Sequence, residues 1–125
     1  MVARIDKTDS AIGVFRAKLG FAPVSGDVGA IFGVGLNSSG RIVKGGGQTG
    51  IVGVLCLSSL LAQGDVADVL TNGEIVDLAL TAATVYYGDT ATGAINTTAA
   101  ANKRVGWTVE TWRLVVRIGN GAAGG

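Results

Sequence analysis

Alternating apolar and polar positions recur along the chain and predict short β-strands. Residues 14–21, 104–109 and 113–118 each carry an apolar side chain at every second position. Successive side chains of a strand point to opposite faces, so this period is typical of a half-buried strand. In the second run Val105, Trp107 and Val109 share one face, which predicts that Trp107 packs in the core.

Two other runs are apolar on both faces and predict fully buried strands. These are residues 29–36 and residues 51–57. In the first run Phe32 and Val34 share a side with Leu36, and the other side is lined mostly by glycine. A glycine in a strand lets a second backbone come close, so we expect such an approach here.

Turn signals divide the remaining chain. Asn72-Gly73 lies between two β-prone runs and predicts a hairpin, because both residues tolerate positive φ. Residues 37–40 predict another turn, and Gly45–Gly47 are expected to end a short strand at 41–44. Further short strands are expected at 85–87 and 94–97, and one helical turn between Leu57 and Gln63.

These elements predict an all-β fold, a small β-barrel or sandwich of about eight to nine short strands with Gly-rich turns. A chain of 125 residues allows one domain. We expect residues 1–12 to form an extended N-terminal arm, residues 13–118 the barrel, and residues 119–125 a flexible Gly-rich C-terminal tail.

The amino-acid composition narrows the range of possible functions. Charged residues are 15% of the chain, against about 25% in an average domain, which favours a neutral surface that packs against other proteins. A plain Gly-rich β domain would look the same. The net charge of +1 gives no electrostatic support for nucleic-acid binding. The charged N-terminus and the short apolar runs predict no secretion signal and no membrane span, so synthesis in the cytoplasm is expected.

The sequence predicts no enzyme and no cofactor. It has no histidine, which removes the commonest general base and metal ligand, and its single Cys56 excludes an internal disulfide. Calcium bound by Asp65, Asp68 and Asp77 is conceivable, but no known loop pattern is present. Residues 45–50 resemble a phosphate-binding loop without its Gly-Lys-Ser/Thr ending.

Aromatic residues suggest an interface. Tyr and Trp are favoured there because they combine large apolar area with a polar group. Tyr86 and Tyr87 are adjacent, so their side chains point to opposite faces and one of them is expected at the surface. The candidate interface residues comprise these two, one further aromatic residue and three positions in the arm: Tyr86, Tyr87, Trp112, Arg4, Ile5 and Ile12.

Four segments carry a resemblance to known proteins: Gly-Asp-Val-Ala-Asp-Val-Leu-Thr-Asn-Gly-Glu-Ile-Val from Gly64, Val-Tyr-Tyr-Gly-Asp, Gly-Ala-Ile-Asn-Thr-Thr, and the closing run at 104–118. Over residues 64–118 the chain resembles the capsid decoration (cement) proteins of actinobacterial tailed phages. The resemblance implies a small barrel on the capsid exterior of the virion, bound to the major capsid protein. It also implies an arm that reaches a neighbour, and often a homotrimer.

Three functions follow from these observations. The first is a structural virion protein that stabilises the shell across the seams between capsid subunits. The second is a receptor- or carbohydrate-binding module of a tail fibre or spike, which would use exposed aromatics beside amides, here Tyr86, Tyr87 and Asn96. The third is a hydrolase fragment that works through carboxylates alone.

Overall fold

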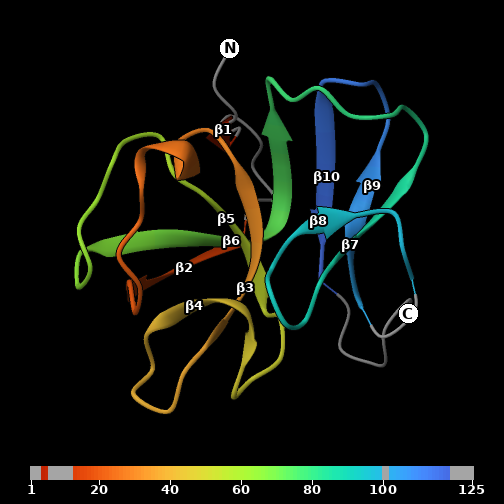
Figure 1. Ribbon diagram of the computed structural model, residues 1–125. Helices are drawn as coiled ribbons and strands as arrows, with labels where there is room; N and C mark the ends of the chain where they lie inside the picture. The colour runs from red at the N-terminus through yellow and green to blue at the C-terminus, as the bar shows by residue number, and fades with distance from the viewer. Residues whose placement is uncertain (1–3, 6–12, 100–101, 119–125) are drawn as a thin grey trace.

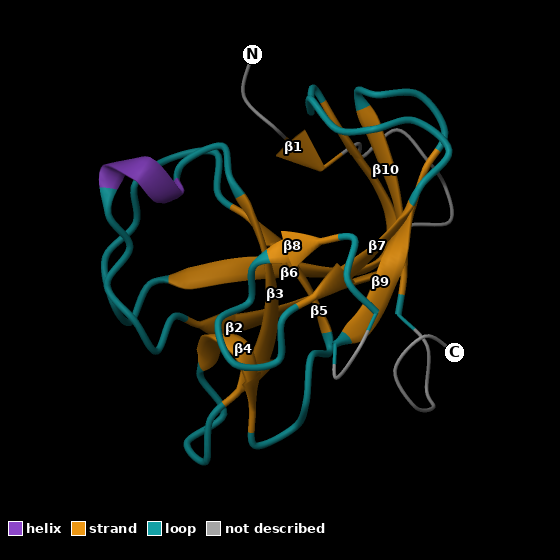
Figure 2. Cartoon of the chain, turned by 45° about the vertical axis from the view of Figure 1, so that its right-hand side comes forward, coloured by secondary structure: helices purple, strands orange, loops and turns teal. Residues whose placement is uncertain are grey.

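The computed structural model describes residues 4–5, 13–99 and 102–118, and these form an all-β protein (Figures 1 and 2). This confirms the predicted fold class, with ten strands in place of eight or nine. One 3-10 turn, η1, is present at Ser25–Asp27. The strands are β1 Arg4–Ile5, β2 Gly13–Lys18, β3 Ile31–Leu36, β4 Ile42–Gly47, β5 Gly53–Cys56, β6 Val66–Val76, β7 Val85–Gly88, β8 Ile95–Asn96, β9 Lys103–Thr108 and β10 Arg113–Arg117.

All ten strands belong to one sheet, with β6 at its centre. The order is β4-β3-β5-β6-β10-β9-β7-β8, and β1 and β2 also pair with β6. Every named pair is antiparallel except β3 with β4. Because β6 spans 11 residues, it pairs with β2 and β5 along its first half and with β1 and β10 along its second.

The second half of the sheet closes into a barrel. A bridge joins Phe32 to Ala94, and the Gly33 N–H donates to the Gly93 carbonyl at 2.8 Å, so the β8 end of the sheet returns to β3. We call the unit of β3, β5 to β10 the barrel lobe. Its core is a cluster of buried side chains, namely Ile51, Val54, Leu70, Ile75, Tyr86, Val105, Leu114 and Val116.

The first half curls into a second unit, the small lobe, made of β2 to β6. A parallel bridge joins Leu19 to Ile42, and the Gly20 N–H donates to the Ile42 carbonyl at 2.7 Å. Its core comprises Leu19, Val34, Ile42, Leu55, Leu57, Ala67 and Val69. The two lobes share β3, β5 and β6. For that reason Val54 faces one core while Leu55 faces the other, and the buried strands predicted at 29–36 and 51–57 are confirmed.

Glycines let the backbones of these shared strands approach neighbouring segments. A Cβ on Gly35 would lie 2.1 Å from the Gly46 carbonyl oxygen, and a Cβ on Gly33 would lie 3.4 Å from Gly88 Cα. A Cβ atom cannot lie as close to a carbonyl oxygen as it would at Gly35, so a residue with a side chain does not fit there without a backbone shift. The predicted close approach at the glycine-lined side of β3 is therefore confirmed.

The hairpin predicted at Asn72-Gly73 is wrong. Strand β6 runs through both residues without reversing, because β10 pairs with it at Asn72 and Gly73 while β1 and β2 occupy its other edge. Gly73 instead has a φ of 154°, and the register of β2 against β6 skips Thr71. Figure 1 shows β6 changing direction as it passes from the small lobe to the barrel lobe. Here Asn-Gly bends a strand rather than ending it.

Two smaller predictions are also wrong. Gly45–Gly47 do not end the strand at 41–44, because β4 continues to Gly47. The Gly46 N–H donates to the Thr90 carbonyl at 2.9 Å, so the glycines fit β4 closely against another segment. Residues 58–63 form bends and a turn, and the expected helical turn is absent from this described segment.

The predicted arm and tail fall largely outside the described residues. Within 1–12 only Arg4–Ile5 is described, and it forms β1 against Val76 and Ile75 of the same chain. Ile12 and the tail at 119–125 lie outside the described residues.

Candidate interface surface

The predicted interface residues Arg4 and Ile5 lie at one end of the barrel lobe. Arg4 pairs with Val76 on one edge of β6, and Val76 pairs with Arg113 on the other edge. The turn between β9 and β10, at 109–112, directly precedes Arg113. This turn and β1 lie at the same upper end of the molecule in Figure 1.

Tyr86 and Tyr87 point to opposite faces, as predicted, and only one is accessible. Tyr86 is buried in the barrel core, and its hydroxyl accepts a hydrogen bond from the Thr81 N–H at 3.0 Å. Its ring therefore stabilises the barrel and is not offered to a partner, which corrects its place among the interface candidates. Tyr87 is half-buried and pairs with Asn96 of β8.

Trp112 has the properties of an interface residue. It lies in the turn between β9 and β10 and is 47% exposed. The guanidinium of Arg113 lies 5.6 Å from the centroid of its ring, within the range of a cation–π interaction. A large apolar ring is thus held at the surface by a neighbouring cation.

Arg113 is itself fixed by two carboxylates. It donates to Glu110 through Nε at 2.9 Å and through Nη2 at 2.8 Å, and to Glu74 through Nη1 at 3.2 Å. Hydrogen bonding by Arg113 lowers the pKa of Glu110, and the same contacts raise the pKa of Arg113. Such a bidentate pair adds geometric specificity to a charge contact. The cation beside Trp112 is therefore positioned before any partner arrives.

Backbone hydrogen bonds anchor the same turn from behind. The N–H groups of Leu78, Leu80 and Ala83 donate to the carbonyls of Trp112, Thr111 and Val109 at 3.1, 2.7 and 3.3 Å. The segment that follows β6 therefore runs alongside the turn and is hydrogen-bonded to it without forming a regular strand. These bonds use main-chain atoms, so the side chains of Val109 and Trp112 remain at the surface.

Val109 was expected on the core face with Val105 and Trp107, and this prediction is wrong. The register of β7 against β9 shifts between Tyr86 and Tyr87, where two residues of β7 oppose three of β9. A bulge of this kind reverses the alternation beyond it. As a result Val105 and Thr108 are buried, Trp107 is half-buried, and Val109 is 46% exposed.

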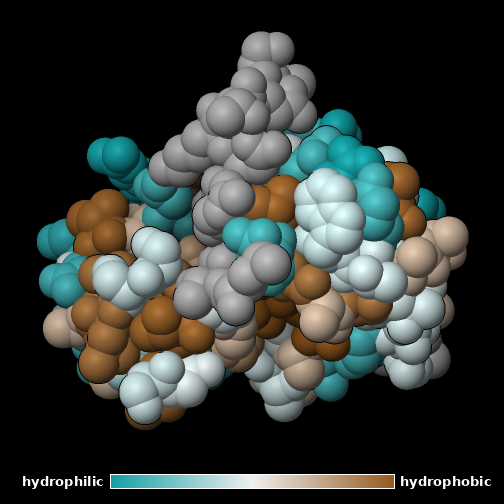
Figure 3. All heavy atoms as spheres, turned by 90° about the horizontal axis from the view of Figure 1, so that it is seen from above, coloured by the Kyte–Doolittle hydropathy of each residue, from teal (hydrophilic) through white to brown (hydrophobic). Residues whose placement is uncertain are grey.

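Four of the six large exposed hydrophobics among the described residues lie on segments at the β1 end of the molecule. Val109 and Trp112 lie on the β9–β10 turn, while Val24 precedes η1 and Leu60 follows β5. A bridge between Val28 and Leu57 holds the last two segments together. We call Val24, Leu60, Val109 and Trp112 the apolar end. Figure 3 looks down on this end and shows apolar surface over the small lobe. Alternation does not reveal Val24 and Leu60, because both lie in loops.

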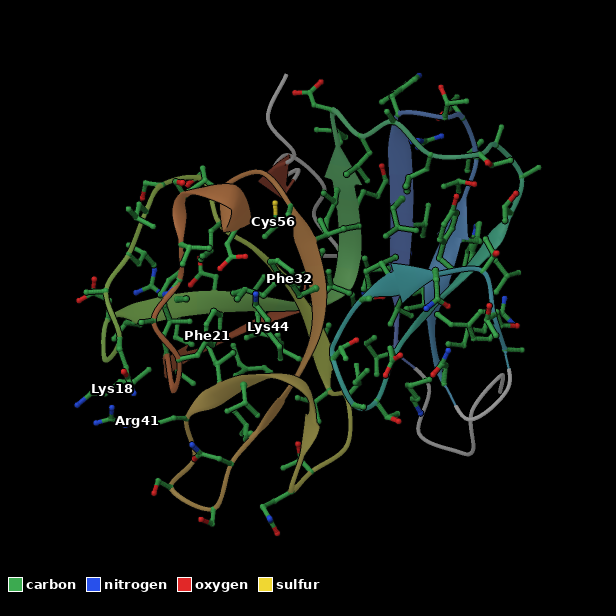
Figure 4. The ribbon with its side chains drawn as sticks, in the orientation of Figure 1. Lys18, Phe21, Phe32, Arg41, Lys44 and Cys56 are labelled. Carbon is green, nitrogen blue, oxygen red and sulfur yellow. The ribbon has the colours of Figure 1, made fainter. Side chains whose placement is uncertain are left out.

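A partly buried ion pair lies beneath the apolar end. Lys44 Nζ is 3.0 Å from Asp27 Oδ1 and 4.1 Å from the centroid of Phe32, with Phe21 on another side (Figure 4). Asp27 Oδ2 also accepts the Val24 N–H at 3.0 Å. Hydrogen bonding by Val24, and then by Lys44, lowers the pKa of Asp27. This network holds η1 and Val24 against β4.

Two cations lie away from the apolar end. The Leu19–Ile42 bridge brings Lys18 and Arg41 together, and Figure 4 shows both pointing outward from the small lobe. Among the ion pairs of the described residues, none involves either of them. The molecule therefore presents different chemistry on its two sides.

The acids considered for calcium have other contacts. Asp65 Oδ2 accepts the Ala62 N–H at 2.8 Å, and Asp68 pairs with Arg16 at 3.0 Å. In the part of the chain that the structure describes, no three His, Cys, Asp or Glu residues lie together as metal ligands would. Over the same residues, no helix has the length and apolar character needed to cross a membrane.

The fold and surface define a two-lobed β-barrel protein with one apolar end. Sequence comparison matches no protein family and no curated protein. A solved structure from Mycobacterium phage Patience is similar, with a TM-score of 0.81 and 20% sequence identity. The match covers 94% of this chain and 96% of that chain. At this identity the likeness establishes that the two chains share a fold.

Proposed function

We propose that this protein is a capsid decoration protein of a tailed phage, which binds the outside of the assembled shell and stabilises it across the seams between subunits. The observation that carries the proposal is the fold shared, over nearly the whole chain, with a protein from a mycobacterial phage. The sequence resemblance over residues 64–118 points to the same class. In this proposal the partner is the major capsid protein, and the protein is no enzyme.

The physical properties of the chain suit this task. A decoration protein must bind at many equivalent places and need not turn over a substrate. Each bound copy stabilises the assembled shell by mass action, and many copies on one lattice add their effects. A barrel with an exposed ring at one end offers a preformed contact, and in this proposal its copies on the shell form homotrimers, as the resemblance implies.

The test is reconstitution on capsids that lack the protein. Purified protein is added to such capsids, and electron cryo-microscopy then shows whether it occupies regular positions on the exterior. Capsids with and without it are heated, and DNA release is followed by dye fluorescence. We expect regular external density and release at a higher temperature. Unchanged release together with an undecorated exterior would refute the proposal.

The tail-fibre alternative receives less support. Its binding cluster required Tyr86, Tyr87 and Asn96 together at the surface. Tyr86 is in the barrel core, which leaves Tyr87 beside Asn96. A glycan array with the purified protein is the direct check on this alternative.

A further inference from the structure

We infer that the apolar end is the surface that docks on the shell, with Trp112 as its anchor. The inference rests on the proposed function and names the contact that the function requires. Its occupant is a shell-protein surface that offers an apolar pocket with basic groups at the rim.

Exposed apolar side chains lie on several segments of the apolar end. Trp112 and Val109 are 47% and 46% exposed on one turn, and Val24 and Leu60 are 63% and 58% exposed on neighbouring loops of the same end. Single exposed hydrophobics are ordinary on a protein surface, but here two lie on one turn and two lie on a pair of bridged loops, and such grouping is typical of an interaction surface. The remaining two, Val14 and Val66, oppose different residues of the β2–β6 pair, Leu70 and Lys18.

The side chain of Trp112 and its turn are organised before binding. The guanidinium of Arg113 lies over the ring of Trp112 and is held in place by hydrogen bonds to Glu110 and Glu74. The carbonyl groups of the turn accept hydrogen bonds from N–H groups within residues 78–83. Tryptophan is among the residues that contribute most to binding energy, and an anchor already in place loses little conformational entropy on docking.

Glu74, Glu110 and Arg113 together carry a net charge of −1. Arg4, which pairs with Val76, and Asp77, which follows Val76, have opposite charges, so the surroundings of Trp112 keep this net charge of −1. The two outward cations of the small lobe, Lys18 and Arg41, do not belong to the apolar end. A complementary partner therefore places basic groups around the pocket that receives Trp112.

The experiment compares matched variants for binding to capsids that lack the protein. Val109→Ser alters the apolar end, while Val66→Ser alters a valine of similar exposure on β6 that does not belong to the apolar end. Trp112→Ala removes the anchor, and Trp112→Phe keeps an aromatic ring. Each variant is first shown to be folded by its thermal unfolding, and its affinity is then measured by co-sedimentation with capsids.

We expect Trp112→Ala to weaken binding at least about tenfold and Trp112→Phe by much less. Val109→Ser is expected to weaken binding about threefold, and Val66→Ser by less than about twofold. The affinity of the unchanged protein should fall as salt is raised, because exposed charges are screened. A salt-independent affinity would overturn the basic rim.

The outcomes separate the inference from the proposed function. If the unchanged protein binds capsids and Trp112→Ala binds equally well, the docking surface is wrong while the function stands. If the unchanged protein does not bind, the function itself is refuted. Light scattering after gel filtration shows whether the protein associates with itself, and so tests whether a second copy of the chain occupies the apolar end instead. Loss of self-association in Trp112→Ala, with capsid affinity retained, would assign this end to a second copy of the chain.

Discussion

Lys44 on β4 reaches Asp27 in η1 at 3.0 Å, and its ammonium group lies over the ring of Phe32. The side chain of Asp27 is 10% exposed and that of Lys44 is 32% exposed, so the pair is partly removed from water. Removing one partner of such a pair leaves the other charge poorly solvated.

Lys44→Met should therefore lower the free energy of unfolding by about 2 kcal/mol, less than for a fully buried pair because Lys44 retains some contact with water. Urea unfolding followed by tryptophan fluorescence measures the change. Arg16→Met is the matched control: it breaks the exposed Arg16–Asp68 pair and should cost less than about 0.5 kcal/mol. Equal effects of the two variants would contradict a structural role for the Lys44–Asp27 pair.

The lowered pKa of Asp27 predicts an acid-dependent loss of stability. Asp27 is ionised in the folded state below the usual carboxyl range, so it stabilises the fold at pH values above the unfolded pKa. That contribution is lost as the pH falls through the folded pKa. We expect Asp27→Asn to lose less stability than the unchanged protein below about pH 4.

Lys44→Met should keep part of this pH dependence, because the Val24 N–H is the largest cause of the lowered pKa. Unfolding titrations of the three proteins at several pH values measure the slopes. The same slope in Asp27→Asn and in the unchanged protein would assign the acid sensitivity to other carboxylates.

The close packing of Gly35 against Gly46 predicts that no larger residue fits there. In Gly35→Ala the added Cβ would lie 2.1 Å from a backbone oxygen, so β3 or β4 would have to move. We expect a loss of about 3 kcal/mol or more, or failure to fold. Gly26→Ala is the control, because nothing lies within 4 Å of its added Cβ. Thermal unfolding compares the two, and a Gly35→Ala protein of unchanged stability would contradict the observed contact.

The local sequence pattern predicted much of this fold, because the order of apolar and polar residues along a strand shows whether one face or both faces are buried. The shared strands β3 and β5 follow from their apolar runs, and the approach to Gly33 and Gly35 follows from glycines on one face. These features depend on neighbouring residues, which a sequence displays directly.

The features that sequence could not reveal depend on distant partners. Asn72-Gly73 has the local chemistry of a hairpin, but pairing on both edges of β6 keeps the strand extended. Similarly, the bulge opposite Tyr86 and Tyr87 moves Val109 to the surface. Trp112 was identified by residue type alone, whereas its clamp by Arg113, Glu110 and Glu74 joins residues from two strands and a turn.

The two adjacent tyrosines allow the stability contribution of a buried hydroxyl to be compared with that of a half-buried one. Tyr86→Phe removes the oxygen that accepts the Thr81 N–H, which should lower the free energy of unfolding by about 1 kcal/mol. Tyr87→Phe removes the hydroxyl of a half-buried side chain and should change it by less than about 0.5 kcal/mol. Urea unfolding distinguishes them, and a larger effect at Tyr87 would reverse the assignment of the barrel core.

Cys56 reports whether the barrel stays closed. Burial raises the pKa of its thiol to about 11, and its side chain is packed against the core of the barrel lobe. The thiolate is the reactive form, so the raised pKa leaves much less thiolate in the folded protein than in the unfolded chain at pH 8. We therefore expect labelling by a chromogenic disulfide to be at least about tenfold slower in native buffer than in denaturing urea. Labelling that is equally fast in both would contradict the packing of Cys56 against the core of the barrel lobe.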